Sequence, residues 1–163
     1  MPSFSSTTRF SLSGIVVNTW SHGSGALKSS HSYWSGFDFA AAGWQGVAVD
    51  THIYQVFNTD MVAWTGDQHI AAACDYATSL SGYDFWVVVG EWSPAATDCA
   101  KYLNGRGVGA RYDGTHPDAT KAVGSCTGLT GSASTFSEDY KQFLAKFWAA
   151  QAIAFEQIGR AHV

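Results

Sequence analysis

The chain has 163 residues, of which 46% are hydrophobic and 13% charged, and its formal net charge is −4. This length suits one modest domain, and the apolar content excludes a wholly disordered chain. The acidic balance argues against nucleic acid or an anionic membrane as the main partner, since both favour basic patches, and no apolar run reaches the ~20 residues of a membrane span.

The first segment, residues 1–31, is rich in Ser and Gly and carries one candidate strand, Gly14-Ile15-Val16-Val17. It does not match a signal peptide, because no basic stretch precedes an apolar core. We leave the segment unassigned as to structure and expect it to be intron-derived or misassembled sequence.

The next region alternates regularly between strand and helix patterns. A strand is predicted over residues 46–57, in which His52 and Tyr54 are two positions apart and therefore share one face. A polar loop over residues 60–67 then leads to a helix over residues 68–80. The residues expected on one face of this helix are Ile70, Ala73 and Ala77.

A second strand is predicted over residues 85–92, and it ends on a carboxylate, Glu91. The preceding residue, Gly90, permits close approach of the backbone. Retaining glycosidases place their nucleophile in such a setting, at the carboxyl-terminal rim of a β/α barrel. Together with the polar tip of the previous strand, Glu91 makes sugar hydrolysis the first hypothesis. Without its neighbours, an exposed strand-end acid is the simpler interpretation.

The last part of the chain is predicted to contain two helices separated by a long loop. Ser93 is a candidate N-cap for a helix reaching Asn104, and the Gly-rich stretch 105–131 has no helical period. A capping box over residues 135–138 begins the second helix, which reaches Glu156. Three side chains of this helix are expected to be core: Phe143, Phe147 and Trp148.

Other polar residues receive structural interpretations. Asp98 and Asp113 are expected to cap and order loops. The remaining histidines are assigned to the surface or to artefact: His22, His31, His69, His116 and His162. The His and Cys residues lack the spacing of metal ligands, so no metal and no cofactor is predicted. Of the three cysteines, two are expected to pair and one to lack a partner.

Alternating strands and helices predict an α/β fold with parallel strands. Two strands cannot close a barrel or bury both faces of a parallel sheet, so the chain is expected to be part of a larger barrel. The last six residues, 158–163, match a common sequencing-library adapter read in frame, and they are excluded from fold reasoning as an artefact.

Several motifs of this sequence, in their order and spacing, resemble the fungal exo-β-1,3-glucanases of glycoside hydrolase family 5. The resemblance runs from about Tyr33 to Glu156, roughly three quarters of the chain. The motifs are Asp50-Thr51-His52-Ile53-Tyr54-Gln55-Val56-Phe57, Val89-Gly90-Glu91-Trp92-Ser93, Thr97-Asp98-Cys99-Ala100-Lys101-Tyr102-Leu103-Asn104-Gly105 and Gly109-Ala110-Arg111-Tyr112-Asp113-Gly114.

The resemblance implies that residues 32–157 form the carboxyl-terminal part of a (β/α)8 TIM barrel, roughly from strand five or six to the helix after strand seven. It also implies roles for four residues. Glu91 is then the nucleophile, Tyr54 hydrogen-bonds its carboxylate, His52 contacts sugar hydroxyls, and Phe57 walls the entrance to the sugar site.

The resemblance further implies a Cys99–Cys126 disulfide, with Cys74 losing a partner that lies elsewhere in the family. A retaining mechanism needs a second carboxylate about 5–5.5 Å from the nucleophile, and the family carries it in an Asn-Glu-Pro motif that this sequence lacks. The other two Glu residues, Glu138 and Glu156, fall on the last helix.

The leading hypothesis is therefore a fragment of a secreted or cell-wall enzyme, monomeric as a whole, that cleaves β-1,3-glucan by double displacement. Alone, the fragment is expected to be inactive. Two alternatives remain open. One is a non-catalytic carbohydrate-binding protein, since 15% of the residues are aromatic and aromatic faces stack on sugar rings. The other is a truncated product without function.

Overall fold

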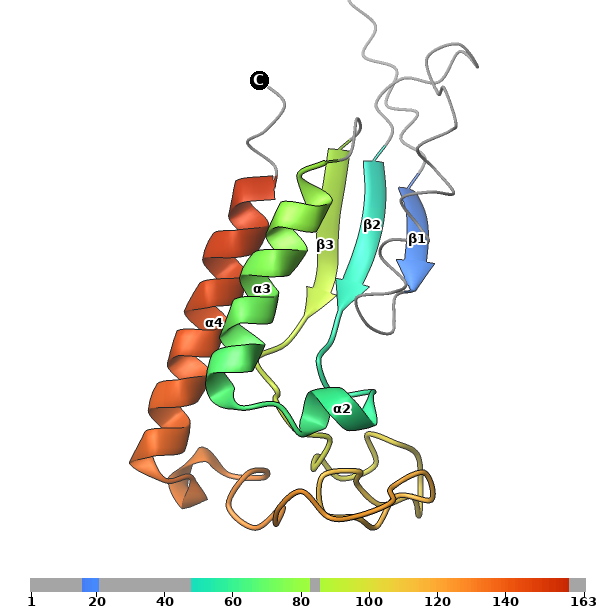
Figure 1. Ribbon diagram of the computed structural model, residues 1–163, viewed down its shortest axis with the longest axis vertical. Helices are drawn as coiled ribbons and strands as arrows, with labels where there is room; N and C mark the ends of the chain where they lie inside the picture. The colour runs from blue at the N-terminus through green and yellow to red at the C-terminus, as the bar shows by residue number, and fades with distance from the viewer. Residues whose placement is uncertain (1–15, 21–47, 83–85, 159–163) are drawn as a thin grey trace, which may run out of the picture.

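The computed structural model describes residues 16–20, 48–82 and 86–158. Its three strands, β1 (Val16–Trp20), β2 (Ala48–Ile53) and β3 (Trp86–Trp92), form a parallel sheet in the order β1-β2-β3. The two long helices, α3 (Gly66–Leu80) and α4 (Glu138–Ile158), run side by side along one face of this sheet (Figure 1). The parallel strands and helices expected from the alternation are thus present.

Strand β2 presents alternate residues to the helices and to the opposite face of the sheet. Val49, Thr51 and Ile53 are buried, whereas Asp50 and His52 are only half-buried. The strand ends at Ile53, four residues before the predicted end at Phe57. A short helix, α2 (Thr59–Val62), follows it where a loop was expected, because the Asn58 side chain accepts the backbone N–H groups of Asp60 and Met61.

Helix α3 begins two residues earlier than predicted and ends at the predicted Leu80. Its start is a capping box: the Thr65 hydroxyl accepts the Gln68 N–H, and the Gln68 side chain accepts the Thr65 N–H. The buried residues of this helix are His69, Ala73, Tyr76 and Leu80. The surface position expected for His69 is therefore wrong, since this residue lies one turn before Ala73 on the buried stripe.

Helix α4 closes the hydrophobic core from the outer side. Phe147 is fully buried, but Trp148 is 54% exposed, so the prediction that Trp148 is a core residue is wrong. The capping prediction is also corrected, because Thr135 lies in a 3-10 turn, η1 (Ala133–Thr135). Ser137 is the residue whose hydroxyl accepts an N–H of the first turn, that of Tyr140.

Residues 93–132 contain no helix, so the helix predicted from Ser93 to Asn104 is wrong. The cause is Asp98, whose buried carboxylate accepts the backbone N–H groups of Arg111 and Tyr112 and an amide N–H of Asn104. These contacts fold the chain back on itself here, and Tyr102 adopts a left-handed φ of 69°.

Burial alone would raise the pKa of the Asp98 carboxyl. The hydrogen bonds from Arg111, Tyr112 and Asn104, together with the Arg111 charge, outweigh burial and hold that pKa below its ordinary value. Asp98 is therefore an ionised centre of the loop, in agreement with the structural role predicted for it. Asp113 likewise orders the loop by accepting the hydroxyl and the backbone N–H of Thr115.

The disulfide expected from the resemblance joins Cys99 to Cys126, with 5.4 Å between their Cα atoms. Cys74 is exposed and has a free thiol. Residues 1–15 and 159–163, which include the start of the candidate strand at Gly14 and most of the adapter-like tail, lie outside the described residues.

Candidate active site

The carboxyl-terminal end of β3 contains an irregularity that determines where Glu91 lies. Up to Thr51 and Val89 the register of β2 with β3 is regular, but the next pair is His52 with Glu91, so Gly90 is an extra residue in β3. A single extra residue of this kind is a β-bulge, which reverses the alternation of side chains beyond it.

The bulge places Glu91 on the same face as His52. Before it, Val87 and Val89 pack against the helix-facing core, and strict alternation would have sent Glu91 to that side as well. After it, Trp92 takes the helix-facing position and packs against the α4 rings of Trp148 and Phe155, with centroid separations of 6.3 Å and 5.7 Å. The bulge thus brings the predicted nucleophile to the predicted substrate-binding histidine.

One oxygen of Glu91 is held by both predicted neighbours. The Tyr54 hydroxyl donates to Oε2 at 3.1 Å, and Nδ1 of His52 lies 3.2 Å from the same atom. Among the described residues, Oε1 of Glu91 accepts no hydrogen bond. Because the Glu91 side chain is 52% exposed, this second oxygen is open to an incoming molecule.

Partial burial and the contact with Glu91 both affect the pKa of the Tyr54 phenol. Burial, the hydrogen bond to Glu91 and the Glu91 negative charge, in that order, raise the pKa of Tyr54 above its usual value. Tyr54 therefore remains a proton donor to Glu91 at neutral pH. Its ring packs edge-to-face on Phe57, with 5.6 Å between centroids, so Phe57 adjoins the predicted site.

Asp50, for which no role was predicted, belongs to the same cluster. Its Oδ2 lies 3.1 Å from Nε2 of His52, and its Oδ1 accepts the Gly90 N–H at 3.0 Å. The signal was present in the sequence, since Asp50 precedes His52 by two residues and so shares its face of the strand. Only the bulge at Gly90 could not be read from the pattern.

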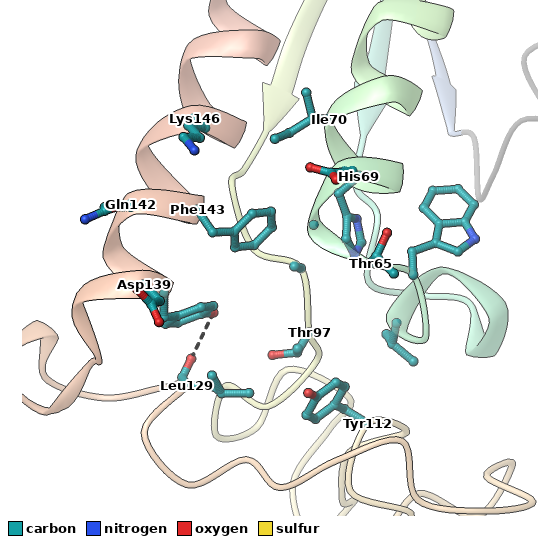
Figure 2. A pocket seen from close by; sticks show the side chains of 16 residues that line it. Thr65, His69, Ile70, Thr97, Tyr112, Leu129, Asp139, Gln142, Phe143 and Lys146 are labelled. Carbon is teal, nitrogen blue, oxygen red and sulfur yellow. Dashed lines mark hydrogen bonds between the residues drawn. The ribbon is translucent and has the colours of Figure 1, made fainter.

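A separate cavity of about 530 Å³ lies between α3, α4 and the loop that precedes α4 (Figure 2). None of the predicted catalytic or substrate-binding residues lines it. Its buried member His69 faces Gln55, whose Oε1 lies 2.6 Å from Nδ1. Burial lowers the pKa of His69 from 6.5 to about 4, so this imidazole is neutral at physiological pH and serves the packing of the helices.

The described residues contain neither a group of metal-binding side chains nor a membrane-spanning helix. Within them, no three His, Cys, Asp or Glu side chains gather into a group that could hold a metal ion. No helix in the same part of the chain is long and apolar enough to cross a membrane.

Comparison with known proteins finds similar fungal proteins that are all described as glucan 1,3-beta-glucosidases. The chain is 41% identical over 133 residues to the glucan 1,3-beta-glucosidase of Lachancea kluyveri, covering 80% of this chain and 30% of that protein. It is 48% identical over 125 residues to the probable glucan 1,3-beta-glucosidase A of Aspergillus niger, covering 76% and 29%. The glucan 1,3-beta-glucosidase I/II of Saccharomyces cerevisiae is 39% identical over 132 residues, covering 79% and 29%.

No family model matches the chain. The chain spans about three tenths of the length of these relatives. Their agreement over most of this sequence confirms the resemblance inferred from the motifs: the chain is similar to a portion of the fungal glucan 1,3-β-glucosidases.

Proposed function

We propose that this chain carries the nucleophile side of the active site of a retaining glycosidase that cleaves β-1,3-glucan. The observation that supports this most directly is the arrangement of Glu91, whose Oε2 is held by Tyr54 and His52 while Oε1 remains open. The names of the relatives indicate the proposed substrate class, a 1,3-linked β-glucan.

In the proposed reaction, Oε1 of Glu91 attacks the anomeric carbon and forms a covalent glycosyl ester. The bond from that carbon to the glycosidic oxygen breaks, and an acid residue of the complete enzyme protonates the leaving oxygen. Water, activated by the same residue, then displaces Glu91 and restores its carboxylate. Tyr54 and His52 limit the rotation of Glu91, so that the attacking oxygen is positioned before the sugar arrives.

We further propose that the fold is part of a (β/α)8 barrel. On the face of β3 away from the helices, Trp86 and Val88 are 63% and 52% exposed. In a barrel these positions point inward and are covered by the remaining strands. His52 and Glu91 then lie at the carboxyl-terminal rim, where barrel enzymes carry their sites.

The second carboxylate is proposed to come from outside these 163 residues. Glu138 and Glu156 both lie on α4, and Glu138 is paired with Lys141 at 2.7 Å. We therefore expect the 163-residue chain to release no glucose from a β-1,3-glucan. Glucose release that disappears in Glu91→Gln would show that the chain already holds its acid.

A secreted or cell-wall location forms part of the proposal. The Cys99–Cys126 bridge closes a long exposed loop, and such bridges persist in oxidising compartments. The enzyme as a whole is proposed to act as a monomer on the glucan without a cofactor.

The nucleophile assignment is tested in the complete product of the gene, with a 2-deoxy-2-fluoro-β-glucoside that carries a dinitrophenolate leaving group. Fluorine slows hydrolysis of the glycosyl ester, so the modified peptide can be found by mass spectrometry. We expect the label on Glu91, none in Glu91→Gln, and unchanged labelling in the control Glu156→Gln. A label on another carboxylate would remove Glu91 from this role.

A further inference from the structure

We propose that Asp50 is a positioning residue for the nucleophile, acting through the Gly90 bulge and through the tautomer of His52. This inference rests on the proposed role of Glu91. Asp50 contacts the two groups that determine where Glu91 points and which atom of His52 faces it: the Gly90 N–H and Nε2 of His52.

The first of these groups is the backbone of the bulge. A bulge leaves one residue of the strand without its regular ladder partner, and in β3 that residue is the exposed Gly90. Oδ1 of Asp50 accepts the Gly90 N–H at 3.0 Å. The carboxylate thus takes the place of the missing ladder partner and stabilises the register in which Glu91 meets His52.

The contact also explains why a glycine stands next to the nucleophile. A Cβ built on Gly90 would overlap Oδ1 of Asp50 and would lie only 3.0 Å from its Cγ. Any side chain at this position would displace the carboxylate. Asp50 and Gly90 are therefore a matched pair, and changing either should have the same consequence.

The second group is the His52 imidazole. An ionised carboxylate can only accept hydrogen bonds, so we assign the proton of the neutral ring to Nε2, which lies 3.1 Å from Oδ2 of Asp50. The other nitrogen, Nδ1, is the atom that faces Oε2 of Glu91 at 3.2 Å. In this assignment Asp50 determines which nitrogen of the neutral ring is turned toward Glu91.

The consequence for the proposed reaction is a defined proton position. With Nε2 held by Asp50, the Nδ1 edge of the ring faces Oε2 of Glu91 before attack and leaves Oε1 to the sugar. In the opposite tautomer the proton would lie on Nδ1 and Nε2 would be unprotonated. Nε2 could then donate no hydrogen bond to Asp50.

The experiment is a long-range 1H–15N NMR measurement of the His52 ring in the full 163-residue chain, at mildly alkaline pH where an ordinary imidazole is neutral. In the unaltered chain we expect Nε2 to show the shift of a protonated nitrogen. In Asp50→Asn the amide oxygen can still accept from Gly90, which turns the NH2 group toward Nε2. We expect the Nε2 resonance to move downfield, to the position of an unprotonated nitrogen.

Two further variants make the outcome decisive. Gly90→Ala should reproduce the Nε2 shift, because its methyl group displaces the Asp50 carboxylate, whereas the exposed control Asp75→Asn should leave the His52 signals unchanged. His52→Asn assigns the resonances.

An Nε2 that is unprotonated in the unaltered chain, or that keeps its proton in Asp50→Asn, overturns the proposal. The NMR measurement needs no turnover, so its result does not depend on whether Glu91 is the nucleophile. Labelling at Glu91 without a tautomer change would reject Asp50 alone, and labelling elsewhere would reject the proposed function.

Discussion

Tyr54 reports on the charge of its neighbour, because the Glu91 carboxylate contributes two of the three causes that raise the phenol pKa. In Glu91→Gln the charge disappears, although the side-chain oxygen can still accept the Tyr54 hydroxyl. We expect the pKa of Tyr54 to fall but to stay above its usual value, since burial, the first cause, remains. The measurement is a pH titration of the Tyr54 ring carbon by NMR. An unchanged titration in this variant would mean that the hydrogen bond is absent in solution.

His69 makes stability depend on pH in the acidic range. Its pKa is about 4 in the folded chain and 6.5 when exposed, so folding favours the neutral ring. Above pH 6.5 the contribution to stability is complete. As the pH falls from 6.5 toward 4, the unfolded chain takes up a proton that the folded chain does not, and stability is lost.

We therefore expect the free energy of unfolding to decrease between pH 7 and pH 5 by more in the unaltered chain than in His69→Phe. Urea unfolding at both pH values measures this, and only the difference between them is compared, because the substitution also removes the bond to Gln55. Equal pH responses in the two proteins would show that His69 is not buried in solution.

Among the elements, those with a long apolar period were predictable from the sequence, and those controlled by a single polar side chain were not. Helix α3 ends where predicted and begins within two residues of its predicted start, although only Ala73 of its expected face is fully buried. The helix expected after Ser93 had two local signals of a helix start, an N-cap serine and Pro94 at the first helical position. It fails because the buried Asp98 binds backbone groups more than ten residues away, which no local pattern reveals.

The candidate site divides in the same way. The presence of His52, Tyr54 and Glu91 at neighbouring strand ends was predictable from spacing, and so was their proximity. The face on which Glu91 lies was not, because an extra residue in β3 has meaning only relative to the register of β2. The place of Asp50 on the His52 face of β2 was predictable from spacing, but its contact with the N–H group of the bulge was not.

At the level of packing, Phe147 is one of the buried residues through which α4 contacts the rest of the fold. This ring is fully buried and lies 5.4 Å from the His69 ring and 5.8 Å from the Phe143 ring. Phe147→Ala should lower the free energy of unfolding by about 3–5 kcal/mol, the usual cost of such a cavity. Trp148→Ala, on the exposed side of the same helix, is the control and should cost clearly less. Urea denaturation followed by circular dichroism compares the two, and equal losses would contradict the assigned helix face.

For the molecule as a whole, the two faces of the sheet are unequal. The helices cover one face, whereas Trp86 and Val88 on the other remain largely in water. Exposed apolar side chains next to one another on a strand favour association. The barrel proposed above would bury these side chains inside the complete enzyme. In the 163-residue chain they are exposed and should promote self-association.

We expect the chain to associate in a concentration-dependent way and the double variant Trp86→Thr/Val88→Thr to associate less, as measured by sedimentation velocity. A matched control is Leu103→Thr/Val123→Thr, which changes two exposed apolar residues of the long loop. If association is driven by the uncovered sheet face, the strand variant reduces it and the loop variant does not. If both variants behave like the unaltered chain, the sheet face is already covered in solution and the inward position proposed for Trp86 and Val88 loses its support.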